Sequence, residues 1–356
     1  RPSKHQISPK PLNMNEVLPL LTLLDAIPPS QLRDLAENRV LGVQQIGQKP
    51  ADNHCPAPTQ TLSMPIFHAD ANLLCDVWLA NAPCQIEQFD GVRICYNDQV
   101  LFGVIEIDEA KFALRDANSV LRAATDKAYQ QIFNALNAKN YPHLWRAWNY
   151  IPDIHDAETG LERYRQFNIG RHQAFESTRR AVDSSPAASA LGTRGGLFSV
   201  AFIAGRTAPI RIENPRQISA YAYPSRYGPR SPAFSRAVTV TDATHCMLFV
   251  SGTASIVGHE TVHSGDVVAQ TREAVANVSA LLEQVNTATM PPIPLKDLTY
   301  RVYIRHPHHH PLVRAALDAS LNAPAHALYV QADICRTDLL VEIEAFAVAP
   351  LTAQKP

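Results

Sequence analysis

The chain has 356 residues, of which 46% are hydrophobic and 18% are charged. This length exceeds the roughly 250–300 residues at which a single hydrophobic core stops growing, so we expect more than one core. A formal net charge of −1 excludes an overall basic field that would attract nucleic acid or an anionic membrane.

The first 60 residues are rich in proline, and we expect this N-terminal segment to be irregular. Its longest apolar run, VLPLLTLL, is shorter than the about 20 residues that span a bilayer and is interrupted by Pro19. We see no signal peptide and expect a cytoplasmic protein. The six cysteines form no C-x-x-C pair, which predicts reduced thiols and not a disulfide framework.

Two later parts of the chain share one order of elements, and we expect an N-terminal domain at 61–205 and a C-terminal domain at 237–356. In the first, hydrophobic periodicity predicts strands at 99–107, 143–151 and 195–205 and helices at 117–136 and 160–182. In the second, it predicts strands at 245–256, 298–306 and 339–346 and helices at 264–285 and 310–321. The predicted fold class is α+β, with two units in tandem, each a mixed sheet with helices packed on one face. Residues 206–236, rich in Pro, Arg and Tyr, would form a linker that contributes to the site.

Arginines and tyrosines concentrate in three places: residues 163–171, residues 214–237, and Arg305 at the end of a predicted strand. Arginine is suited to bidentate recognition of a carboxylate or a phosphate. For any single arginine, a surface pair with a nearby acid is the commoner explanation, but the cluster as a whole favours an anion site. No GxGxxG or P-loop motif is present, so a small carboxylate substrate fits better than a nucleotide.

The stretch LLVEIEAF (339–346) has strand-like alternation, which would place Val341, Ile343 and Ala345 on one face. The other face would carry Leu340, Glu342, Glu344 and Phe346. A carboxyl between apolar neighbours favours its protonated form, which makes it a candidate general acid. An ion pair with one of the arginines explains the pattern equally well. Cys335 has no histidine nearby in the sequence, so a buried structural thiol or a pocket wall is a better interpretation than a nucleophile.

Two histidine motifs invite a metal site, and we expect none. HPHHHP (306–311) is flanked by prolines, so its consecutive histidines would point in different directions. HETVH (259–263) is predicted to lie in a turn before a helix, and not on the helix itself. No other cofactor is indicated by the sequence.

The second half resembles the RidA/YjgF-like family in three segments, LFVSGTASI, GDVVAQTREAVANVSALLEQV and VEIEAFAV. Members of that family are trimers with pockets between subunits, and their deaminases use an arginine in a PAR motif. Here the corresponding residues are Pro324, Ala325 and His326, which argues against enamine or imine deamination. A RidA-like deaminase or binding protein remains an alternative.

Most of the chain resembles the chorismatases, through LWRAWNYIPDI (144–154), GLERYRQFNIGRHQAF (160–175), PAASALG (186–192), the segment 214–237, and SGTASIVGHETVHSGDVVAQT (251–271). PAASALG departs from the commoner PAATGIG. The resemblance implies two RidA-like units, with a site in the C-terminal unit covered by the N-terminal one. It implies cleavage of the enolpyruvyl ether of chorismate to pyruvate, without a cofactor. The net charge predicts no nucleic-acid or membrane partner. Two fused units could replace contacts that RidA trimers make between chains, so we expect a monomer or small homo-oligomer.

The resemblance also implies roles for individual residues. Glu342 would be the general acid that protonates the enolpyruvyl methylene carbon, and Glu344 would support it. Arginines 163, 171 and 305 would bind the substrate carboxylates, with hydroxyl donors at Tyr150, Tyr164, Tyr221 and Tyr227. A cysteine seven residues before the acid is associated with members that form 3-hydroxybenzoate, some of which also give 4-hydroxybenzoate, and Cys335 has that position. The alternative product is the dihydroxycyclohexadiene carboxylate of the simple hydrolases.

Overall fold

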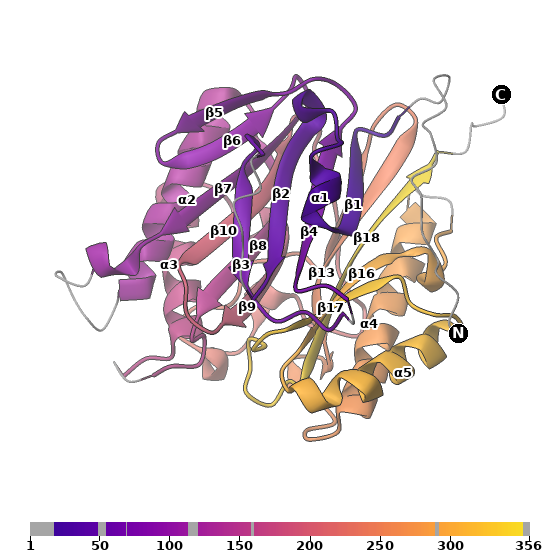
Figure 1. Ribbon diagram of the computed structural model, residues 1–356. Helices are drawn as coiled ribbons and strands as arrows, with labels where there is room; N and C mark the ends of the chain where they lie inside the picture. Colours follow the sequence, from indigo (N-terminus) through magenta and orange to yellow (C-terminus); the bar gives the residue numbers. More distant parts are fainter. Residues whose placement is uncertain are drawn as a thin grey trace.

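The computed structural model describes residues 18–48, 55–68, 70–112, 120–157, 160–288 and 292–351. These residues form an α+β fold with three main sheets, here called the N-terminal, middle and C-terminal sheets (Figure 1). Two predictions concern residues that lie partly outside the described ranges. They are the irregular segment at 1–60, of which residues 1–17 and 49–54 are not described, and the helix expected at 117–136, of which residues 117–119 are not described.

The N-terminal sheet has the strand order β1-β4-β2-β3. Its strands are β1 (Leu21–Ile27), β2 (Val40–Gly47), β3 (Thr59–Ser63) and β4 (Leu73–Ala80), with the short helix α1 (Pro29–Leu32) between the first two. The expectation of an irregular segment is therefore wrong for residues 21–27 and 40–47. Buried glutamines made β2 hard to recognise as a core strand in the sequence. Gln44 can be buried because its amide donates to the amide of Gln60 at 2.8 Å.

The middle sheet has the order β5-β6-β7-β10-β8-β9 and carries two helices on its outer face. The elements are β5 (Gln85–Phe89), β6 (Val92–Tyr96), β7 (Val100–Ile107), α2 (Val120–Lys139), β8 (His143–Pro152), α3 (Arg163–Ser177), β9 (Ala187–Thr193) and β10 (Phe198–Gly205). The three predicted strands and both helices of this unit are confirmed, while β5, β6 and β9 were not predicted.

The C-terminal sheet repeats this arrangement in the order β11-β12-β13-β18-β16-β17. The elements are β11 (Ile210–Ile212), β12 (Ala237–Thr241), β13 (His245–Ala254), α4 (Val267–Ala288), β16 (Thr299–Ile304), α5 (His310–Leu321), β17 (Ala327–Gln331) and β18 (Val341–Pro350), beside the small hairpin of β14 (Ile256–Val257) and β15 (Glu260–Thr261). In both six-stranded sheets only the last pair is parallel, β8 with β9 and β16 with β17. The predicted repeat is therefore real, whereas domain boundaries at 205 and 237 stay a prediction.

The inner faces of the three sheets meet in one hydrophobic core. The ring of Trp78 on β4 lies 5.5 Å from Trp148 on β8, 6.0 Å from Phe249 on β13 and 4.9 Å from Phe346 on β18. Helices α2 and α3 cover the outside of the middle sheet, and α4 and α5 cover the outside of the C-terminal sheet (Figure 1). Among the described helices, none combines the length and apolar character needed to cross a membrane.

Trp78→Ala should remove the centre of this core. The side chain is 2% exposed and its indole nitrogen has no hydrogen-bond partner among the described residues, so the loss is one of packing. We expect the free energy of unfolding to fall by about 3–5 kcal/mol in urea denaturation. The control Ile86→Ala, at a side chain 48% exposed, should change it by less than about 0.5 kcal/mol. Equal losses in the two variants would contradict a core shared by three sheets.

Candidate active site

Strand β18 lies at the centre of the C-terminal sheet, between β13 and β16. Its alternation directs Val341, Ile343 and Ala345 into the core beneath α4 and α5, as predicted. Phe346 lies on the opposite face, as predicted, and packs in the three-sheet core. Leu340 was expected on that inner face, but it packs beneath the helices, because it precedes the strand and does not follow the alternation.

Glu344 is held by a buried network on the inner face. Its Oε2 atom accepts from Arg146 Nη2 at 2.6 Å and from the Ser189 hydroxyl at 2.8 Å, and its Oε1 accepts from the Trp148 indole at 3.1 Å. Arg301 Nη1 lies 3.4 Å from the same Oε1. The ion-pair explanation left open by the sequence thus applies to Glu344.

Glu342 has the opposite environment. Its side chain is 4% exposed and takes part in no hydrogen bond or ion pair found among the described residues. Burial, and secondly the negative charge of Glu344, raises the pKa of Glu342 to about 8, against a smaller opposing effect of Arg146. The carboxyl is therefore mostly protonated at neutral pH and is free to donate a proton.

A β-bulge makes room for this carboxyl. Two residues of β13, Ser251 and Gly252, lie opposite the one residue Glu344 of β18. A Cβ atom on Gly252 would collide with Oε1 of Glu342. The absence of a side chain at Gly252 thus lets the backbone approach the acid closely.

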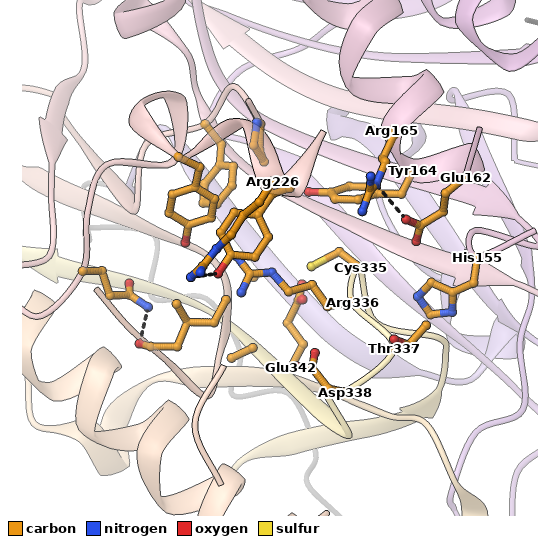
Figure 2. Close-up of a pocket in the computed structure, with 18 of the residues that line it drawn as sticks. His155, Glu162, Tyr164, Arg165, Arg226, Cys335, Arg336, Thr337, Asp338 and Glu342 are labelled. Atoms are coloured by element: carbon orange, nitrogen blue, oxygen red, sulfur yellow. Dashed lines mark hydrogen bonds and ion pairs between the residues drawn. The ribbon is translucent and has the colours of Figure 1, made fainter. Parts of the chain in front are cut away.

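Glu342 opens into a cavity of about 590 Å³ that both six-stranded units help to build (Figure 2). The residues lining it come from five places: 155–165, 217–236, the end of β13 with β14, 335–338 and β18. Besides Glu342 they include His155, Glu162, Tyr164, Arg165, Gln217, Tyr223, Arg226, Tyr227, Phe234, Arg236, Gly252, Cys335, Arg336, Thr337 and Asp338.

Two arginines at the cavity keep buried N–H groups without a partner among the described residues. Arg336 donates from Nη1 to the His259 carbonyl at 2.9 Å, and its guanidinium lies 4.0 Å from the centre of the Tyr227 ring, while its Nη2 has no acceptor. Arg236 donates to the Tyr223 hydroxyl at 2.8 Å, while its Nε has no acceptor. These two groups can bind an anion inside the cavity.

The other two lining arginines are already paired with acids. Arg165 lies 3.2 Å from Glu162, and Arg226 lies 2.7 Å from Glu260. Arg226 and Glu260 are exposed, so their pair contributes little to stability. These pairs leave Arg236 and Arg336 as the better candidates for binding an anion.

Cys335 and Tyr164 line the cavity beside Glu342 in their neutral forms. Burial raises the pKa of the Cys335 thiol to about 12, with a further contribution from Glu342. Burial also raises the pKa of Tyr164 well above its ordinary value, followed by the effect of Cys335. The thiol is therefore a wall and not a thiolate nucleophile, and the phenol remains a hydrogen-bond donor.

Two arginines expected at the substrate lie elsewhere, because partners distant in the sequence hold them. Arg163 forms a two-bond pair with Glu109, at 2.7 and 2.9 Å. Arg305 binds Asp333 at 2.7 Å and the carbonyls of Ile334, Arg336 and Leu339. Arg305 therefore fixes the segment that carries Cys335 and Arg336.

Of the remaining candidates, Tyr164 and Tyr227 line the cavity, whereas Tyr150 and Tyr221 do not. The Tyr150 hydroxyl lies 2.8 Å from that of Tyr303, inside the three-sheet core. Tyr221 is 37% exposed on the surface. Arg171 borders a small recess beside the cavity.

Sequence reasoning missed Arg336, Gly252 and the buried partners of Glu344. The only signal for Arg336 was its position next to Cys335. Arg236 and Tyr223 lie in the segment 214–237, which the sequence had indicated as a cluster. Within the described part of the chain, no group of three or more His, Cys, Asp or Glu side chains is arranged to hold a metal ion.

A family model, related sequences and a solved structure all match this chain to the same family of proteins. Residues 76–204 match the family "Chorismatase FkbO/Hyg5-like, N-terminal", and residues 229–349 match "Endoribonuclease L-PSP". A "3-hydroxybenzoate synthase" of Streptomyces hygroscopicus is 37% identical over 76% of this chain and 80% of its own length. A "Chorismatase" of Streptomyces rapamycinicus is 38% identical with the same coverage. A chorismatase crystal structure superposes with a TM-score of 0.80 at 31% identity, covering 92% of this chain and 98% of the other.

The raised pKa of Glu342 should make stability depend on pH. Between about pH 4.5 and about 8 the folded protein holds a proton that the unfolded chain has released, so the free energy of unfolding falls as pH rises. Glu342→Gln cannot release this proton. Its free energy of unfolding should therefore fall less with rising pH than that of the wild type, by about 1.4 kcal/mol per pH unit in that range. Urea denaturation of both proteins across the range measures the difference. Parallel curves would show that Glu342 has an ordinary pKa.

Proposed function

Because the chain belongs to the chorismatase family, we propose that it cleaves the enolpyruvyl ether of chorismate and releases pyruvate and 3-hydroxybenzoate. One observation carries this proposal: a buried, unpaired carboxyl at Glu342 faces a cavity that also contains arginine N–H groups without acid partners. An acid that protonates carbon must keep its proton near neutral pH, which burial provides here.

The first step is proton transfer from Glu342 to the methylene carbon of the enolpyruvyl group. The electron pair of the carbon–carbon double bond forms the new C–H bond, and the ether oxygen stabilises the cation that remains on the neighbouring carbon. The bond between the ether oxygen and the ring then breaks, and its electron pair returns to the oxygen, which leaves as the carbonyl oxygen of pyruvate. The ring carbon is left as a cation, and the hydroxyl on the adjacent ring carbon closes onto it as an epoxide and returns a proton to Glu342. The epoxide then opens at the carbon that first carried the hydroxyl, and the hydrogen beside the retained oxygen becomes the phenol hydrogen of 3-hydroxybenzoate. Pyruvate and hydroxybenzoate together contain the atoms of chorismate, so aromatisation consumes no water, whereas the diene diol route consumes one.

Chorismate carries two carboxylates, and two cavity arginines are suited to them. Arg336 and Arg236 offer buried N–H groups that lack acceptors among the described residues. The neutral phenol of Tyr164 and the hydroxyl of Tyr227 add donors on the same walls. We assign the carboxylates to these residues in place of Arg163 and Arg305, whose guanidinium groups are occupied by Glu109 and Asp333.

Cys335 is the basis for proposing the aromatic product. Its neutral thiol lies beside Glu342 and Tyr164 on the cavity wall, where it occupies space that water would need. Exclusion of water favours rearrangement of the ring over hydrolysis. A relative with 37% identity is named 3-hydroxybenzoate synthase, which supports the same product.

The direct test mixes the purified protein with chorismate. We expect pyruvate, detected through lactate dehydrogenase, in equal amount to 3-hydroxybenzoate, separated by chromatography. Pyruvate accompanied by a non-aromatic diol would keep the ether cleavage and refute the aromatic product. Absence of pyruvate would refute the proposed function.

Glu342→Gln should lower kcat by roughly 10²–10⁴-fold, because an amide of nearly equal shape cannot donate the proton. The same change at the exposed Glu283 on α4 should leave kcat unaltered. In the wild type, kcat/KM should fall as pH rises through about 8, where Glu342 loses its proton. Wild-type turnover in folded Glu342→Gln would remove this residue from the catalytic step.

Cys335→Ala should shift the product from 3-hydroxybenzoate towards the diene diol, because the smaller side chain admits water next to the ring. The matched control is Cys246→Ala, a buried thiol in the core beneath α4 and α5. Chromatography measures the ratio of 3-hydroxybenzoate to diene diol in the wild type and in both variants. An unchanged ratio in Cys335→Ala would exclude the thiol from product choice.

A further inference from the structure

A recess of about 40 Å³ adjoins the main cavity and shares Glu342, Cys335, Tyr164 and Gly252 with it. Its other walls come from α3 and β9 and include Asn168, Arg171 and Ser189. A space of about 10–15 Å³ is enough for one water molecule, so the recess has room for a small occupant.

Arg171 brings an uncompensated charge to this recess. Its side chain is 2% exposed, and no ion pair or hydrogen bond found among the described residues involves it. Its Nε and Nη2 atoms are buried without acceptors. Both polar atoms of the Asn168 amide are likewise buried, and the phenol of Tyr164 interacts with this amide.

Aromatic rings hold Arg171 in place but do not satisfy it. The guanidinium carbon lies 5.0 Å from the ring centre of Tyr129, 5.8 Å from that of Phe175 and 5.9 Å from that of Phe167. Such contacts attract the cation through the ring faces. They leave the N–H bonds, which need acceptors of their own, without a partner, and an unpaired buried charge costs several kcal/mol.

None of the neighbouring acidic groups serves as the counter-ion. Glu342 borders the recess but is mostly protonated at neutral pH. Glu344 is bound by Arg146 and Arg301. The phenol of Tyr129 is neutral, since burial raises its pKa, and it donates to Asn149 at 2.6 Å.

We propose that this recess binds a small monovalent inorganic anion of the size of chloride, held by the N–H groups of Arg171 and the amide of Asn168. The size of the recess favours a halide over a sulfate or a phosphate. The anion would neutralise Arg171 in the free protein. This inference does not depend on the proposed function.

The first experiment measures Tm while sodium chloride replaces sodium gluconate at constant ionic strength, since gluconate is too large for the recess. An anion that binds only the folded protein raises the folded-to-unfolded ratio about tenfold at ten times its Kd, so Tm should rise with chloride. Arg171→Gln should abolish the rise. Arg122→Gln removes the same charge from an exposed side chain on α2 that contacts Gln173, and it should keep the rise.

A second experiment needs no variant. Crystals of the unmodified protein soaked in sodium bromide should give an anomalous peak at Arg171, measured at the bromine absorption edge. Absence of both the peak and the chloride-dependent rise in Tm would overturn the proposal.

The remaining possibility is that a substrate carboxylate, and not a free anion, occupies the recess. Chloride would then compete with chorismate, raising KM and leaving kcat unchanged, and this result would overturn a resident anion. A KM that does not rise with chloride, together with the rise in Tm, supports it. Because Tm and bromide binding require no turnover, failure here and failure of the proposed chemistry are distinguishable.

Discussion

The carboxylate of Glu344 connects all three sheets of the molecule. It lies on β18 and binds Arg146 of β8, while Arg301 of β16 bridges it to Asp76 of β4. Two cations and two anions balance in this buried network, so its net contribution to stability is small, but removal of one member costs about 3–5 kcal/mol. Because side chains two apart on a strand share a face, fixing Glu344 also fixes the direction of Glu342.

The two carboxyl groups therefore have different roles. Glu344 accepts from several buried donors and helps to hold the sheets together, whereas Glu342 lacks donors and keeps its proton. The charge of the first raises the pKa of the second. One structural anion thus adjusts the acidity of its neighbour without touching the cavity.

The elements that could be predicted from the sequence are those set by the pattern of neighbouring residues. Alternation on β18 and the helical stripes of α2 and α4 depend on neighbouring residues alone, and these elements were found where expected. Four of the residues that the resemblance indicated, Glu342, Cys335, Tyr164 and Tyr227, line one cavity, and their roles stay a prediction. Arg163 and Arg305 do not line the cavity, because each pairs with an acid distant in the sequence, such as Glu109 for Arg163, and such pairing leaves no local trace. The strands of the N-terminal sheet were missed for the related reason that their buried amides have partners in other elements.

The bulge at Gly252 has a consequence for reading related sequences. Oε1 of Glu342 occupies the position that a side chain at 252 would need, so the two positions cannot vary independently. A chain with a glutamate at the position of Glu342 and a bulky residue at the position of Gly252 would have its carboxyl displaced, whatever the rest of its sequence resembles. If Glu342 has the proposed role of general acid, the residue at position 252 bears on how that acid is placed, so the two positions should be read together in a related sequence.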